Sequence, residues 1–375
     1  MSNNFKGSIA QKNVQFPIET VIEPLAGENY SRAMIFVPNS KAAEYLGGID
    51  GTEINKLYEI TSSNYGTIAT DLLLTWLVPF FKNATAVKVG IVIYDDGEDA
   101  GNTLSVCYEK FKMWAYFKFA IHDEDNYVAQ QVALATLCLP DSLYSDCWIG
   151  TSDKNVMSST STLITQLKNA SCNPRIIYNP DTTKNPALAQ LGKTLSVANS
   201  QTGTPIGNST DMVAFSTIGA SGDAGDDGSA TNLSSTDCAA LDNQKIGYQT
   251  YVGDGTENVV TEGSLTLQGE SVGANWVKHY IEYMCKVKTA TMITRMNVYR
   301  NNATYQKALL ILSDIVQDFV DLGRLDGFTI TAPIFADLAD SGDSFIVPNA
   351  WEATYIDTTR EVTIYGTLYM TEPTR

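Results

Sequence analysis

Two kinds of hydrophobic pattern alternate along the first two thirds of the chain. Short apolar runs rich in β-branched residues, such as Val87–Tyr94, are typical of strands buried in a parallel sheet. Longer amphipathic segments between these runs predict helices. The predicted strands are Ala33–Val37, Val87–Tyr94, Lys112–Ile121, Cys147–Gly150, Arg175–Tyr178 and Ile246–Val252, and the predicted helices are Thr67–Phe81, Asn126–Cys138, Thr160–Asn169, Pro186–Ser200 and Ser234–Asn243. This alternation predicts an α/β domain with a mixed, mostly parallel sheet covered by helices.

The last third of the chain has a different pattern. Two long helical segments, Asn275–Arg295 and Ala303–Leu322, follow each other, and Gly323 is placed to end the second one. Shorter strand patterns at Phe328–Ile334 and Phe345–Val347 come next, followed by an alternating strand at Arg360–Met370. We therefore expect a helix-rich C-terminal domain beside the α/β domain, α+β overall.

The N-terminal segment also carries an alternating strand. Its apolar side chains recur at every second position from Val14 to Ile22, and Pro17 confines the strand to an edge or a terminus. Met1–Ala10 has no apolar run, so we expect no secretory signal peptide and synthesis in the cytoplasm. The longest apolar stretch, Leu72–Phe81, is half as long as a membrane span.

The net charge of the chain limits the classes of partner that it can bind. The 375 residues include 42 acidic and 25 basic side chains, which give a net charge of −17. This argues against a nucleic-acid partner and against an anionic membrane surface. One region has the opposite net charge, because the range from Asn275 to Lys307 contains six basic residues and the single acid Glu282. These cations either balance neighbouring acidic surface or form a docking face for an acidic partner.

The sequence contains little of what catalysis requires. It has two histidines, His122 and His279, and no G-x-S-x-G nucleophile elbow. Leu191–Thr194 imitates the end of a phosphate-binding loop, but Ala187 stands where the first glycine is needed. The acidic loop around Asp223 lacks the spacing of a calcium loop. We expect no enzyme, no cofactor and no metal.

The six cysteines follow no metal-binding pattern. Zinc and iron–sulfur sites need closely spaced pairs, and the chain has no C-x-x-C. Free thiols are the favoured interpretation, and disulfides formed after release into an oxidising medium stay open as the alternative.

Two passages of the chain carry a recognisable set of motifs. The first is the LYEITSSNYG strand at 57–66, a helix ending in PFFKN and a valine-rich strand. The second comprises LDNQKIG at 241–247, GDGT at 253–256, EGSLTL at 262–267, WVKHY at 276–280 and GRLDG at 323–327. Taken in order, these segments resemble contractile phage tail sheath proteins and the sheaths of related contractile injection systems, and the second passage matches the order of the sheath C-terminal domain. Ala84 and Thr85 replace two glycines of the family pattern. The resemblance covers residues 57–94 and 241–327.

This resemblance implies a structural role. Sheath subunits stack as six-membered rings around an inner tail tube in a metastable extended state, and contraction drives the tube through the host envelope. The implied partners are copies of the chain itself, the tube protein, and baseplate and terminator proteins, in a virion tail assembled in the host cytoplasm. The implied organisation is an N-terminal arm at 1–27, an outer α/β domain at 28–250, and an inner, tube-facing domain at 251–375 that ends in an exchange strand.

Two groups of residues become candidates for assembly contacts. An unpaired apolar edge strand is an aggregation hazard unless another copy covers it, so the terminal strands suit exchange between neighbours. Their apolar members are Phe16, Ile18, Ile22, Ile364, Leu368 and Met370. The candidates for the tube-facing surface are Lys278, Lys286, Lys288, Arg295, Arg300 and Lys307, and some of these are expected to meet the acidic row Asp314, Asp318 and Asp321 of the same or a neighbouring subunit.

Two other functional classes remain to be separated from the sheath hypothesis. A tail tube or capsid-type virion protein would also be acidic, poor in histidine and polymeric, but tubes are mostly β and lack a helix-rich C-terminal domain. An α/β enzyme is the third class, and the sequence shows no converging cluster of His, Cys or acidic residues to support it.

Overall fold

The computed structural model describes most of the chain between residues 32 and 355. The described residues are 32–47, 53–83, 87–97, 99–112, 114–120, 127–139, 145–180, 185–197, 214–215, 233–251, 259–262, 265–270, 272–295, 301–321, 323–337 and 350–355. The predicted terminal strands, the strand at 345–347 and the acidic loop around Asp223 lie outside these residues.

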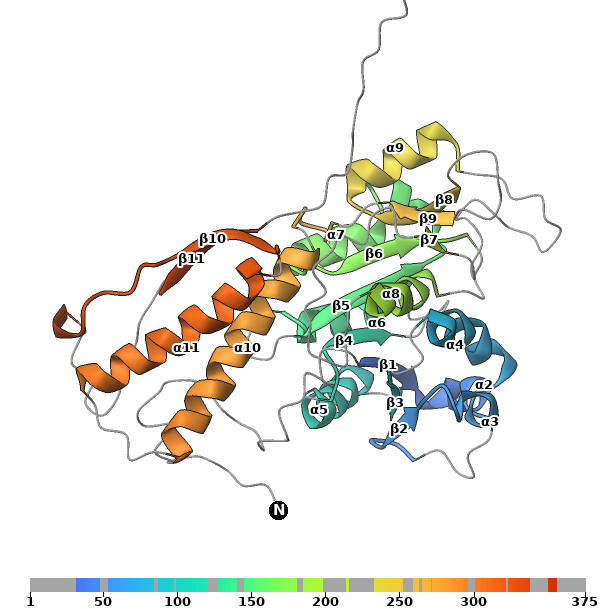
Figure 1. Ribbon diagram of the computed structural model, residues 1–375. Coiled ribbons are helices and arrows are strands. Elements are labelled where there is room, and N and C mark those ends of the chain that lie inside the picture. The colour runs from blue at the N-terminus through green and yellow to red at the C-terminus, as the bar shows by residue number, and fades with distance from the viewer. Residues whose placement is uncertain are drawn as a thin grey trace, which may run out of the picture.

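A mixed sheet forms the centre of the molecule (Figure 1). Its nine described strands lie in the order β2-β3-β1-β4-β5-β6-β8-β9-β7. The pairings along the middle are parallel, while β2 with β3, β8 with β9 and β7 with β9 are antiparallel. The strands are β1 (Ala33–Pro38), β2 (Leu57–Ile60), β3 (Val89–Tyr94), β4 (Phe117–Ala120), β5 (Asp146–Thr151), β6 (Arg175–Tyr178), β7 (Ala214–Phe215), β8 (Gly247–Tyr251) and β9 (Val259–Glu262). The predicted α/β class is confirmed.

Helices cover both faces of this sheet, which explains why its central strands are apolar at every position. In β1, Ala33, Ile35 and Val37 point to the face covered by α4 and α8, while Met34 and Phe36 point to the face covered by α5, α6 and α7. All six residues of β1 and of β3 are buried. The helices of this part are α2 (Ala42–Tyr45), α3 (Tyr65–Ile68), α4 (Asp71–Asn83), α5 (Ala100–Phe111), α6 (Tyr127–Leu137), α7 (Thr162–Asn169), α8 (Pro186–Val197) and α9 (Ser235–Gln244), with short 3₁₀ turns at Asn39–Lys41 and Lys154–Met157. A further 3₁₀ turn, Phe335–Asp337, belongs to the C-terminal part.

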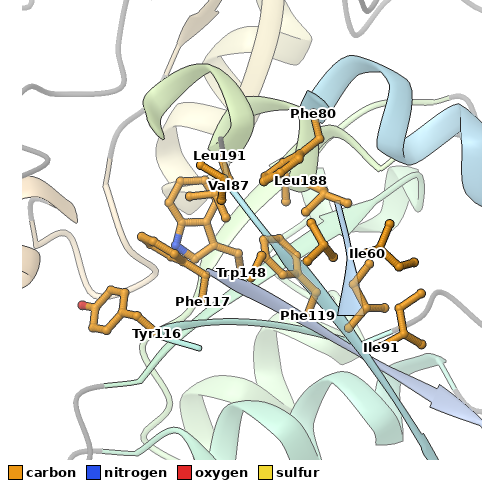
Figure 2. Close-up of a cluster of buried hydrophobic side chains, with 14 of the residues drawn as sticks. Ile60, Phe80, Val87, Ile91, Tyr116, Phe117, Phe119, Trp148, Leu188 and Leu191 are labelled. Carbon is orange, nitrogen blue, oxygen red and sulfur yellow. The ribbon is translucent and has the colours of Figure 1, made fainter. Parts of the chain in front are cut away.

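Aromatic side chains fill the apolar layer under α4 and α8. Figure 2 shows Trp148 of β5 beside Phe117 and Phe119 of β4, with Leu188 and Leu191 of α8 above them. The ring centroids of Trp148 and Phe117 lie 5.6 Å apart at nearly a right angle, an edge-to-face contact. Residues of β1 to β6 and of helices α4 and α8 therefore share one continuous core.

The C-terminal part consists of a long helix pair and a two-stranded sheet. Helix α10 (Val272–Arg295) and α11 (Asn302–Asp321) lie side by side, and α11 packs on β10 (Leu325–Ile330), which pairs antiparallel with β11 (Trp351–Tyr355) (Figure 1). Strand β9 continues the large sheet beyond residue 251 through its pairing with β8. The division into domains at residues 250 and 251 stays a prediction.

Several elements differ from their predicted form. Strands β9 and β11 were not predicted, and β10 begins at Leu325 rather than Phe328. The single helix predicted for Thr67–Phe81 is broken between α3 and α4, because the Thr70 N–H donates to the Tyr45 carbonyl at 3.0 Å instead of continuing the helix. Helix α5 was not predicted at all. Strand β4 begins at Phe117 rather than Lys112, because Trp114 N–H closes a turn onto the Phe111 carbonyl. None of the described helices is both long and apolar enough to cross a membrane.

Gly192 explains the apparent phosphate-loop sequence Leu191–Thr194. These residues lie inside α8, where α8 crosses α4. A Cβ atom added to Gly192 would meet the Cα and the carbonyl oxygen of Phe80 at 2.8 Å. The glycine therefore permits close contact between two helices, and its backbone forms no phosphate cradle.

We predict that Gly192→Ala destabilises the protein by about 1–3 kcal/mol, because the added methyl group forces α4 and α8 apart. Gly101→Ala in α5 is the matched control, since no atom lies within 4 Å of a Cβ added there. That control should leave the unfolding free energy unchanged or raise it by up to about 1 kcal/mol. Urea unfolding of both variants measures the difference, and equal stabilities would show that the helices do not meet at Gly192.

Candidate functional site: the C-terminal helix pair

A hydrogen-bonded turn attaches the start of α10 to the sheet. The Leu267 N–H donates to the Pro174 carbonyl at 3.0 Å, and the Gln268 N–H donates to the Asn173 side chain at 2.8 Å. Glu270 then accepts hydrogen bonds on one carboxylate oxygen from the amides of Asn173 (2.7 Å) and Asn275 (3.0 Å). Asn275 lies in the first turn of α10, so Glu270 joins this helix to the loop that precedes β6.

Tyr116 and His279 form a second link between the sheet and α10. The Tyr116 hydroxyl lies 2.9 Å from His279 Nδ1, at the edge of the sheet where β4 begins. Burial, assisted by the charge of Lys278, lowers the pKa of His279 to about 4. Burial also raises the pKa of Tyr116 well above its usual value. Both groups are therefore neutral near pH 7, and the phenol can donate to the imidazole.

Apolar and aromatic contacts complete this junction. Trp276, Val277 and Ile281 of α10 are buried in the same core cluster as the sheet residues under α4 and α8. Tyr280 stacks on Trp276 at 5.0 Å between ring centroids and meets Phe319 of α11 at 5.7 Å. The helix pair is thus held to the sheet through a shared apolar core.

Both ends of α11 are fixed. Near its start, the buried Tyr305 donates its hydroxyl proton to the Pro333 carbonyl at 2.5 Å and contacts the ring of Phe335. At its end, Gly323 has φ = +67°, and the N–H groups of Gly323 and Arg324 bond to the carbonyls of Val320 and Phe319. This arrangement is typical of a glycine-terminated helix, as the sequence predicts for Gly323.

The predicted cationic residues are distributed along the pair. Lys278 and Lys288 are exposed on α10, and Lys307 is exposed in the first half of α11. Lys286 and Arg295 belong to α10, but their side chains lie outside the described part of the chain, as does Arg300 entirely. Among the described residues, no ion pair joins Lys278, Lys288 or Lys307 to a carboxylate. Their role as a docking face stays a prediction.

The acidic row is on α11. Asp314, Asp318 and Asp321 are all exposed, and Asp321 accepts a hydrogen bond from the Gln317 amide at 2.7 Å. Asp318 and Asp321 lie in the last turn of the helix, where the helix dipole disfavours negative charge by about 0.3–1 kcal/mol per residue. Within the described part of the subunit, no cation pairs with this row.

A buried polar group lies on the sheet next to the junction. Asp146 accepts a hydrogen bond from the Trp148 indole at 2.8 Å, and the guanidinium of the fully buried Arg175 lies over the Trp148 ring at 5.3 Å. Burial raises the pKa of Asp146 to about 6, while the Trp148 hydrogen bond and Arg175 act in the opposite direction. Neither these residues nor the pairing of Tyr116 with His279 was predicted from the sequence. The available signals were Asp146 and Arg175 at the start of predicted strands.

The role of the predicted exchange-strand residues stays a prediction. Phe16, Ile18, Ile22, Ile364, Leu368 and Met370 lie outside the described residues. Within the described part of the chain, no group of three or more His, Cys, Asp and Glu side chains could hold a metal ion.

The burial of His279 at the junction predicts how the stability of the protein changes with pH. Its pKa rises from about 4 in the folded chain to about 6.5 on unfolding, so its contribution to stability is present above pH 6.5 and is lost as the pH falls towards 4. Between pH 7 and 4.5, wild type should lose about 2–3 kcal/mol of unfolding free energy relative to His279→Gln. Urea unfolding of both proteins at the two pH values measures this loss.

The variant Asp146→Asn is a control for which the expected change of stability with pH has the opposite sign. The folded carboxyl has the raised pKa, so wild type should gain stability relative to this variant as the pH falls from 6 to 3.8. If the unfolding free energies of wild type and His279→Gln instead change equally with pH, His279 is not buried at the junction.

Comparison with known proteins shows a shared fold. No protein-family profile and no curated protein matches the chain by sequence. Among solved structures, it is similar to a chain of the "Cryo-EM structure of the anti-feeding prophage (AFP) baseplate, 6-fold symmetrised", with a TM-score of 0.63. The match covers 94% of this chain and 98% of that chain at 11% sequence identity. The chain therefore has, over nearly its whole length, the fold of a chain from a prophage particle.

Proposed function

We propose that the protein is the structural subunit of a contractile tail sheath, which polymerises around an inner tail tube in a metastable extended state and contracts to drive the tube through the host envelope. The observation that carries this proposal is the fold likeness over nearly the full length of both chains to a chain of a six-fold symmetrised prophage structure. The ordered sequence motifs at 57–94 and 241–327 support the same conclusion independently.

The architecture argues against the tail-tube alternative. A tube protein is expected to be mostly β, whereas this chain has a helix pair of 24 and 20 residues after its large sheet. The proposed role is non-enzymatic. The subunits would assemble in the host cytoplasm and become part of the virion tail, in six-membered rings with tube, baseplate and terminator proteins as partners.

We assign the helix pair to the contact with the tube. An extended sheath must align every subunit on the tube and still release it in one step, and exposed ion pairs of about 0–1 kcal/mol each suit that requirement. Lys288 and Lys307 are exposed cations with no ion-pair partner among the described residues. An acidic tube surface would complement them.

The acidic row on α11 fits a contact between subunits. Asp318 and Asp321 are placed at a helix end where the dipole makes their charge unfavourable in the isolated subunit. A cation of a neighbouring copy would offset that cost. The terminal strands carrying Phe16, Ile18, Ile22, Ile364, Leu368 and Met370 are proposed to pair with sheets of adjacent subunits.

A second candidate is a subunit of the baseplate itself. It is favoured because the solved structure to which the chain is similar is that of a prophage baseplate. A sheath subunit forms long tubes of stacked rings, whereas a baseplate subunit forms a ring that does not extend. The two candidates therefore differ in the length of the assembly.

Electron microscopy of the purified full-length protein tests the proposal. We expect long hollow helical polymers, and we expect chains lacking Met1–Gly27 or Glu361–Arg375 to stay folded by circular dichroism but to remain monomeric, because exchange strands are lost. Single rings would favour the baseplate candidate, and uniform small particles would contradict both. A truncated chain that still forms normal polymers would disprove strand exchange at that terminus.

Charge reversal tests the tube contact. The double variant Lys288→Glu and Lys307→Glu should reduce assembly on purified tail tubes at 0.15 M salt by more than about tenfold, since a loss of roughly 1 kcal/mol per subunit is multiplied along the polymer. Spontaneous polymers without tubes should form normally. Lys154→Glu with Lys168→Glu is the control, because both lysines are exposed and lie on the α/β part. Equal loss in both kinds of assembly would mean that Lys288 and Lys307 are structural.

A further inference from the structure

Strand β2 lies at one end of the large sheet. Among the described strands it pairs with β3 alone, in an antiparallel register that places Glu59 opposite Gly90 (Figure 1). On the other side of β3, the Ala33 N–H of β1 donates to the Lys88 carbonyl at 3.3 Å. Lys88 and, two residues further on, Gly90 therefore direct their peptide groups towards β1. Because Glu59 is opposite Gly90, its N–H and C=O point away from β3, to the outside of the sheet.

The side chain of Asn64 is hydrogen-bonded to this outer edge. Its Oδ1 accepts from the Thr61 N–H at 2.7 Å, and its Nδ2 donates to the Glu59 carbonyl at 3.2 Å. In a parallel pair, one residue of an added strand would bond to the same two groups, the carbonyl of one residue and the N–H of the residue two positions further on. The Asn64 amide therefore occupies the place that one residue of an added strand would take.

The turn around Asn64 holds this amide in position. The Asn64 N–H donates to the Thr61 carbonyl at 3.2 Å, and the Asn64 carbonyl accepts from the N–H of Thr67 at 3.0 Å and from its hydroxyl at 2.8 Å. The next residue, Tyr65, stacks on Phe81 of α4 with 5.3 Å between the ring centroids. The backbone of Asn64 is thus fixed to the helical layer, so little conformational entropy is lost when its side chain bonds to the strand edge.

We propose that Asn64 blocks the outer edge of the large sheet, and that the strand it excludes is β2 of a second copy of this chain. An edge strand presents a row of N–H and C=O groups that can pair with another chain unless something covers them. Every copy offers the same edge, and antiparallel pairing of two identical strands forms a closed two-fold contact. By bonding to the Glu59 carbonyl and the Thr61 N–H, Asn64 removes two of the groups that such a contact needs.

Blocking this edge matters for any chain that assembles through strands. Pairing at β2 would join two copies by a contact that competes with the exchange proposed for the terminal strands. The inference does not rest on the proposed sheath role, because an open strand edge promotes aggregation of any folded subunit.

The test compares the association of full-length variants with that of the wild-type protein. Asn64→Ala removes both hydrogen bonds, and Asn64→Leu removes them with a side chain of nearly the same shape. Both should form concentration-dependent aggregates whose thioflavin T fluorescence is at least about tenfold above that of wild type, because the edge is open. Thr67→Ala is the matched control, since it removes a hydrogen bond from the same turn but leaves the Asn64 amide in place, and it should behave as wild type. Circular dichroism shows which variants are folded.

A second substitution tests whether the variants associate through β2. Glu59→Pro, added to Asn64→Ala, removes an outward N–H and places the proline ring on the edge without removing a hydrogen bond between β2 and β3. The double variant should return to the thioflavin T fluorescence of wild type. An undiminished signal in the folded double variant would overturn the proposal, as would folded Asn64→Ala and Asn64→Leu variants that associate no more than wild type does.

Hydrogen exchange of the wild-type protein tests the same geometry without any variant. The Thr61 N–H is bonded to Asn64, whereas the outward N–H of Glu59 is not bonded to that side chain. After correction for their intrinsic rates, the Thr61 amide should exchange at least about tenfold more slowly than the Glu59 amide. Equal exchange of the two amides would show that Asn64 does not cover the edge and would overturn the proposal.

Discussion

The apolar layer on one face of the sheet is the contact on which the rest of the structure depends. It contains side chains of β1, β3, β4 and β5, the inner faces of α4 and α8, and the buried residues of α10 and α11. Burial of each large apolar side chain stabilises the fold by about 1.5–3 kcal/mol. Because Trp276, Val277 and Ile281 belong to the same cluster as Trp148 and Phe117, the helix pair and the sheet share a core.

The polar contacts at this junction determine the orientation of α10 on the sheet more than they stabilise its attachment. Glu270 holds the start of α10 on Asn173, and the neutral pair of Tyr116 and His279 fixes the helix at one edge of the sheet. Tyr116 is buried and His279 is half-buried, so losing one of these two partners would leave the other unsatisfied away from water. A helix pair fixed in this way can present its exposed charges in one orientation, which suits the repeated contacts of the sheath subunit proposed above.

The sequence predicted those elements whose pattern is local. The apolar run of Val87–Tyr94 is a strand buried on both faces, and Gly323 ends α11 in the left-handed conformation. Helix α5 was missed because its first turn contains Gly101, Asn102 and Thr103, which are weak helix formers. The break at Thr70 depends on a hydrogen bond to Tyr45, 25 residues earlier, which no local pattern encodes.

The candidate site was only partly predictable for the same reason. The charge of the region from Asn275 to Lys307 is visible in the sequence, and Lys278, Lys288 and Lys307 are indeed exposed. The burial of His279 and its contact with Tyr116 join residues 163 positions apart. The burial of Lys118 could have been predicted, because a lysine between Phe117 and Phe119 in a buried strand must face the interior or an edge of the sheet.

Hydrogen exchange of the full-length subunit in low concentrations of denaturant tests most directly whether the sheet and the helix pair form one cooperative unit. Amides of α10 near Trp276 and Ile281 should become exposed in the same transition as amides of β1 and β3, because all of them depend on one core. Exposure of α10 and α11 at clearly lower denaturant, while β1 and β3 stay protected, would contradict this account and show that the helix pair is only loosely attached.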